Sequence, residues 1–90
     1  MYMVPFADVY YEAGALEQGN AITERVFEIY SQNLDYYNRL NANLFKYYQK
    51  DYEQAIGIIQ RLSMMAKMYK QNDLYNKIDS FIDQEMKNLK

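Results

Sequence analysis

The chain has 90 residues, which fits one domain, and half of them are hydrophobic, which is enough for a folded core. It contains no Cys and no His, which excludes disulfides, zinc–thiolate sites and thiol catalysis and removes the commonest general base. The net charge of −2 argues against nucleic acid as a partner, because a phosphate-binding surface needs clustered cations.

The composition favours helix throughout. There are only one Pro and three Gly, whereas residues that lose little freedom in a helix are plentiful, and no strand pattern is present. No stretch has the 18 or so apolar residues of a membrane span, and the N-terminus lacks the features of a signal peptide. We therefore expect a single all-α domain over residues 1–90, soluble as given and not inserted in a membrane.

The first two predicted helices form a hairpin. Pro5 suits the first turn of a helix over residues 5–13, and Gly14 can take the left-handed conformation that ends it. Helical spacing of apolar residues resumes at once and predicts a long second helix over residues 16–39. A link this short makes the two helices antiparallel.

The second half of the chain predicts two more helices. The Asn-rich stretch 38–43 is a candidate turn, although a continuous bent helix is an alternative. A wide apolar stripe predicts a third helix over residues 43–70, and an acidic cap at Asp51 offers the alternative of a split near residue 50. Polar residues 71–73 then end the pattern, and a last amphipathic helix is expected over residues 73–89.

The first hairpin resembles the helix junction of a tetratricopeptide repeat. The segment Phe6-Ala7-x-x-Tyr10-x-x-x-Gly14-x-x-x-x-Gly19 has the small, aromatic, turn-glycine and small residues at the offsets of that repeat. The resemblance implies that Ala7 and Gly19 let two helices approach closely, that Tyr10 fills the groove beside them and that Gly14 makes the turn. Thr23 departs from the pattern, where the repeat usually has a large apolar residue.

A second, poorer match to the repeat follows later in the chain. It consists of Leu62-x-x-Met65-Ala66-x-x-Tyr69 and a turn one residue short of the usual spacing. Ala66 and Tyr69 are its expected packing residues. The helices between the two matches do not conform to the repeat.

Taken whole, the chain resembles the soluble C-terminal tail of a family of large bacterial multi-pass membrane proteins of glycosyltransferase-like character. The matching residues, each a helix-packing pattern, are Ala7-x-x-Tyr10-Tyr11-x-Ala13-Gly14, Leu34-x-Tyr36-Tyr37 and Ala55-x-x-x-Ile59-x-x-Leu62-x-x-x-Ala66-x-x-Tyr69. The resemblance implies an extracytoplasmic fragment of a membrane-anchored parent, with the sugar-transfer chemistry elsewhere in that parent. No catalytic residue is carried over.

Chemical motifs are weak in this chain. Its few Ser and Thr have no His to activate them, and no Gly-rich phosphate loop is present. The pairs Glu24 with Glu28 and Asp79 with Asp83 each place two carboxylates one helical turn apart. A solvated helix face explains them better than a cation site or acid–base catalysis, so we expect no cofactor, no metal and no catalytic residue.

Tyrosine is the unusual feature, with 11 copies that include three adjacent pairs. In each pair one ring can face inward while the other lies at the rim, where large, stiff, amphipathic rings suit binding. The candidate contact surface consists of Tyr11, Tyr36, Tyr47, Tyr48 and Tyr52. The alternative is that these rings only widen the stripes between helices. A Met cluster at 64, 65 and 68 is interpreted as core rather than interface.

These features predict a non-catalytic interaction or scaffold module, whose partner is another protein or the rest of its own chain. The alternative is a self-associating helical bundle, a homodimer that pairs through exposed Tyr and Met side chains.

Overall fold

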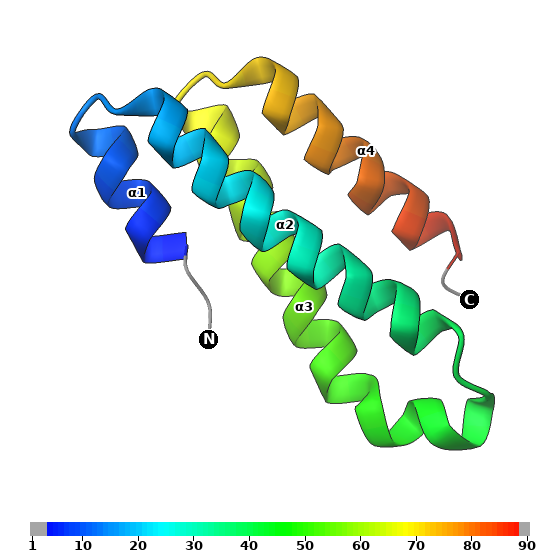
Figure 1. The fold of residues 1–90 in the computed structure, drawn as a ribbon. Helices are drawn as coiled ribbons and strands as arrows, with labels where there is room; N and C mark the ends of the chain where they lie inside the picture. The colour runs from blue at the N-terminus through cyan, green and yellow to red at the C-terminus, as the bar shows by residue number, and fades with distance from the viewer. Residues whose placement is uncertain (1–3, 89–90) are drawn as a thin grey trace.

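The computed structural model describes residues 4–88, and this part of the chain forms four helices and no strand (Figure 1). The helices are α1 (Val4–Glu12), α2 (Leu16–Asn38), α3 (Ala42–Met68) and α4 (Asn72–Asn88). The all-α prediction is confirmed, and the predicted bounds differ from these by two residues at most. The predicted last residue of the fourth helix, Leu89, lies outside the described residues.

The helices run alternately up and down, with α2 and α3 as the central antiparallel pair (Figure 1). α1 packs against the first half of α2, and α4 packs along α3. Because α1 has 9 residues and α2 has 23, α1 spans about 14 Å of a helix about 35 Å long. The far ends of α2 and α3 therefore extend beyond α1.

α3 is one continuous helix of 27 residues, and the alternative of a split near residue 50 is wrong. Phe45 and Tyr52, seven residues apart on either side of residue 50, lie on one face of the helix, and their rings pack against each other with centroids 5.4 Å apart. Within residues 4–88, no helix is both long enough and apolar enough to cross a membrane.

The core is a single cluster to which all four helices contribute. Its fully enclosed side chains come from small and branched residues: Ala7, Leu34, Ile59, Leu62, Ala66 and Ile78. Ala7 and Ala66 are thus packing residues, as the sequence predicts.

α1 ends in a Schellman motif, in which a left-handed residue closes the helix. Gly14 has φ +84°, and its N–H donates to the carbonyl of Tyr11 at 3.0 Å. The N–H of Ala15 donates to the carbonyl of Tyr10 at 2.9 Å. These two bonds are the pair that defines the motif, so Gly14 makes the turn as predicted.

α3 ends in the same motif, although no glycine is present there. Lys70 has φ +62° and donates its N–H to Lys67 at 3.1 Å, and Gln71 donates to Ala66 at 2.8 Å. In both hairpins the next helix begins two residues after the left-handed residue. The α1–α2 and α3–α4 connections therefore share one geometry.

The turn between α2 and α3 falls in the predicted Asn-rich stretch. Asn41 is the N-cap of α3, and its side chain accepts a hydrogen bond from the N–H of Leu44 at 3.0 Å. This capping bond explains why an Asn is favoured at that position.

Candidate contact surface

The close approach of α1 and α2 depends on Gly19 and Tyr11. A Cβ built on Gly19 would lie 2.6 Å from ring carbons of Tyr11, so a larger residue does not fit there. Tyr11 is buried, whereas Tyr10 is 41% exposed. The prediction that Tyr10 fills this groove is wrong by one position, which is a rotation of about 100° around the helix. For the same reason Tyr11 cannot belong to an exposed contact surface.

The hydroxyl of Tyr11 lies against polar groups of α2. It donates to the side-chain oxygen of Asn20 at 2.6 Å and lies 3.1 Å from the hydroxyl of Thr23. Burial raises the pKa of Tyr11, an effect that Glu24 adds to and the hydrogen bond to Thr23 opposes. Thr23 is fully buried, so its departure from the repeat pattern supplies a partner for a buried tyrosine hydroxyl.

Tyr69 joins the two hairpins. Its ring stacks on Tyr11 with centroids 4.9 Å apart, and its hydroxyl donates to Asp8 at 2.8 Å. That hydrogen bond, with burial and the charges of Asp8 and Glu12, raises the pKa of Tyr69 to about 12. Tyr69 is therefore a packing residue, as expected. It is the C-cap of α3, whereas Tyr10, its counterpart in the first repeat match, lies within α1.

The tyrosines at the far end of the central helices form a packed group on the surface. Tyr37 of α2 stacks on Tyr48 of α3 with centroids 5.8 Å apart, and Tyr36 lies edge-on to both rings at 5.8 and 6.4 Å. We call Tyr36, Tyr37 and Tyr48 the tyrosine cluster. Burial raises the pKa of Tyr37, and the neighbouring charge of Asp51 raises it further. Rings that hold one another in place present a stiff apolar surface.

The predicted division between an inward and an outward ring holds for Tyr36 and Tyr37, whereas Tyr47 and Tyr48 are both exposed to different degrees. Tyr36 is 55% exposed beside the half-buried Tyr37, and Tyr47 is 76% exposed beside Tyr48 at 37%. Leu44 is also exposed in the first turn of α3, so the end of this hairpin has several apolar side chains in solvent. Tyr36, Tyr47 and Tyr48 remain candidates for contact.

Tyr52 is buried, so its assignment to the contact surface is wrong. Its hydroxyl donates to a carboxylate oxygen of Glu85 at 2.8 Å, and the side-chain amide of Asn38 donates to the same oxygen at 2.7 Å. Burial, followed by the hydrogen bond to Glu85, raises the pKa of Tyr52. This network connects α2, α3 and α4 through one carboxylate.

Glu85 is itself buried, and the sequence analysis missed it. A signal was present, because residues 78, 82 and 85 lie on one face of α4 and an acidic residue interrupts that apolar stripe. A charge in a core position generally has hydrogen-bonding partners, which here come from two other helices.

The paired carboxylates lie on accessible helix faces. Glu24 pairs with Lys77 at 3.0 Å, Glu28 and Asp83 are exposed, and Asp79 is half-buried. Among residues 4–88 there is no group of three or more acidic side chains arranged to hold a metal ion.

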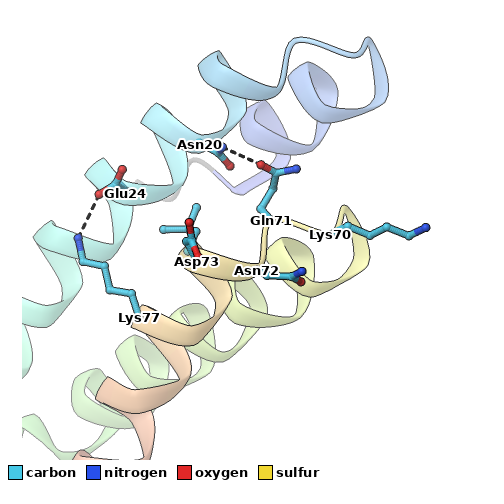
Figure 2. A pocket seen from close by; sticks show the side chains of 8 residues that line it. Asn20, Glu24, Lys70, Gln71, Asn72, Asp73 and Lys77 are labelled. Carbon is cyan, nitrogen blue, oxygen red and sulfur yellow. Dashed lines mark hydrogen bonds and ion pairs between the residues drawn. The ribbon is translucent and has the colours of Figure 1, made fainter.

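A polar pocket of about 560 Å³ lies between α2 and the α3–α4 turn (Figure 2). Asn20 donates to Gln71 at 2.9 Å across it, and Glu24 and Lys77 form their ion pair along its side. Lys70 extends away from the pocket (Figure 2). The polar groups that span this pocket bind one another and connect the two hairpins, so we assign no ligand to it.

The Met cluster divides between core and surface. Met65 is buried, as the core interpretation expects, but Met64 and Met68 are 66% and 65% exposed. For these two residues the core interpretation is wrong, because their side chains lie at the open surface of α3, where they line a groove that Asp8 of α1 borders.

In comparisons of the chain with protein-family models, with curated proteins and with solved structures, nothing matches significantly.

Proposed function

We propose that this chain is a non-catalytic helical interaction module that binds a protein segment through the tyrosine cluster and the neighbouring Tyr47. The observation that carries the proposal is the mutual packing of Tyr36, Tyr37 and Tyr48 at an exposed site. Tyrosine rings lose little conformational freedom on binding, and each combines a large apolar area with a hydroxyl. Such residues often supply most of the binding free energy of an interface.

The chemistry around the cluster favours a particular kind of segment. The rings suit apolar side chains, and Asp51, whose charge acts on Tyr37, attracts a Lys or Arg placed beside them. We therefore expect the bound segment to combine apolar residues with a basic one.

The setting that we propose is the C-terminal part of a larger bacterial membrane protein of glycosyltransferase-like character. Its support is the resemblance in helix-packing residues alone, and in this setting the bound segment belongs either to the same chain or to a partner protein. Reading the genomic sequence upstream of Met1 tests the setting. Membrane-spanning segments in the same reading frame support it, and a translation start signal directly before Met1 contradicts it.

The binding proposal is tested by affinity capture with three forms of the chain: wild type, Tyr36→Ser and Tyr10→Ser. Tyr10 is the matched control, since it is an exposed tyrosine on α1, away from the cluster. A protein captured from a lysate of the source organism is then titrated against each form by calorimetry. We expect Tyr36→Ser to weaken binding at least about tenfold and Tyr10→Ser to leave it unchanged.

Both substitutions are at exposed positions, so equal melting temperatures are required before affinities are compared. Equal affinity of all three forms for the captured protein would show that the binding surface lies elsewhere. Loss of binding in Tyr10→Ser alone would also contradict the proposal and move the surface to α1.

A further inference from the structure

The outer face of α3 has a row of residues, two of them exposed methionines, that no other helix covers within residues 4–88. Gly57, Arg61, Met64 and Met68 are separated by four, three and four residues, the alternation that places side chains along one seam of a coiled coil. They line an open groove of about 760 Å³ that Asp8 of α1 borders. We call these four residues the Met face.

Gly57 is unexplained by packing within the chain. It lies in the middle of α3, where glycine is unfavourable by about 1 kcal/mol relative to alanine. A Cβ built there meets no atom within 4 Å, in contrast to Gly19. The missing side chain therefore leaves open space on the molecular surface rather than room for a neighbouring helix.

The Met face is complementary to itself. When two copies of α3 pack antiparallel about an axis between Arg61 and Met64, Gly57 of one copy lies opposite Met68 of the other. The long, flexible Met side chain then occupies the space above the glycine. A two-fold interface needs this property, because each contact occurs twice with the roles exchanged.

The charges beside the Met face balance in the same arrangement. Arg61 forms no ion pair within residues 4–88, and the groove beside it has Asp8 as its acidic group. In a two-fold dimer the two Arg61 and the two Asp8 side chains share one interface, so their formal charges balance.

We propose that two copies of this chain associate through the Met face as an antiparallel, two-fold homodimer. The inference is independent of the tyrosine cluster, which lies at the other end of α3. Since one helix face per copy is smaller than a typical stable interface, the dimer is weak, with a dissociation constant between about 1 µM and 1 mM.

Sedimentation equilibrium over that concentration range tests the association. We expect wild type to dimerise and Met64→Glu/Met68→Glu to remain monomeric. Met86→Glu is the control, because it places a Glu at an exposed Met on α4 outside the Met face, and it should dimerise like wild type. A wild-type chain that stays monomeric throughout the range would overturn the proposal. So would a dimer that persists in the double variant and is lost in Tyr36→Ser.

Cysteine pairing tests the antiparallel register, because the natural chain has no cysteine. Gly57→Cys and Met68→Cys are mixed and oxidised in air. We expect the mixed disulfide to exceed both symmetric disulfides, whereas a parallel pair would give the two symmetric products instead. A preference for the symmetric products would overturn the register.

Gly57→Leu separates folding from association. The leucine fills the space that Met68 of the second copy needs, so the dissociation constant should rise at least tenfold. At low concentration the same variant should melt no lower than wild type, since a Cβ at residue 57 meets no atom within 4 Å. Unchanged dimerisation in this variant would contradict the proposed contact.

Discussion

The ring of Tyr11 lies directly against the Cα of Gly19, with no room for a side chain between α1 and α2. The same ring stacks on Tyr69 with centroids 4.9 Å apart, so groups from both hairpins restrict its movement. The junction between the two hairpins is therefore tightly packed at this point.

The first prediction is that Gly19→Ala destabilises the protein. Overpacking of a buried site costs about 1–3 kcal/mol, which exceeds the gain of up to about 1 kcal/mol from replacing a helical glycine. The same change at Gly57, where the Cβ meets nothing, should raise the free energy of unfolding by up to about 1 kcal/mol. Urea unfolding of both variants measures the difference, and effects of the same sign would contradict this account.

The second prediction concerns the residues that close α1 and α3. Gly14→Ala should lower the free energy of unfolding by about 1 kcal/mol, because a Cβ is unfavourable in the left-handed region. Lys70→Gly should raise it by up to about 1 kcal/mol, because Lys70 already has that conformation at a cost. Thermal unfolding of the two variants provides the measurement. Destabilisation by Lys70→Gly would contradict this prediction, because it would mean that the Lys70 side chain stabilises the fold by more than its left-handed backbone costs.

Helix positions were predictable from the sequence because the signals that set them are local. The spacing of apolar residues, Gly14 and the Asn-rich turn all act within a few residues of the position that they determine. The inward ring of the Tyr10–Tyr11 pair was not predictable in this way. Neighbouring residues differ by about 100° around a helix, and the position of α3 and Tyr69 decides which of the two rings is covered.

The network around Glu85 also depends on contacts between distant parts of the chain. Tyr52 and Asn38 reach this carboxylate only because α2, α3 and α4 meet there. The sequence shows an acidic residue in an apolar stripe, but it cannot show which donors stand opposite. The tyrosine cluster was partly predictable, since the pairs at residues 36–37 and 47–48 flank the turn between α2 and α3. The stacking of Tyr37 on Tyr48 was not, because it depends on how these two helices pack.

The third prediction is that Tyr52→Phe destabilises the protein by about 1–3 kcal/mol, because a buried carboxylate loses a donor. Glu85→Leu in the same chain should restore part of the loss, since removing both partners leaves no unpaired group in the core. Asn38 is exposed and can bond to water instead. A double-mutant cycle from urea unfolding gives the coupling energy, and additive effects of the two substitutions would contradict a direct interaction.

The last prediction is a loss of stability at alkaline pH. Tyr69 has a folded pKa of about 12 against an ordinary value of 10.0, so the folded chain holds this proton more tightly than the unfolded chain does. The resulting contribution to stability is complete below pH 10.0 and is lost as the pH rises through about 12. Tyr11, Tyr37 and Tyr52, whose pKa values are also raised, act in the same direction.

This pH dependence is measured by urea unfolding in steps from neutral pH to about pH 12. Lysine side chains also lose their charge in that range, so the comparison with variants isolates the tyrosine effect. Tyr69→Phe should flatten the fall in stability between pH 10.0 and about 12, because this variant has no proton to release there. Tyr47→Phe, which alters an exposed ring, should leave the fall as it is in wild type. If Tyr69→Phe and wild type lose stability in parallel, the hydrogen bond from Tyr69 to Asp8 contributes nothing to the alkaline response. The buried tyrosines Tyr11 and Tyr52 then become the residues to substitute next.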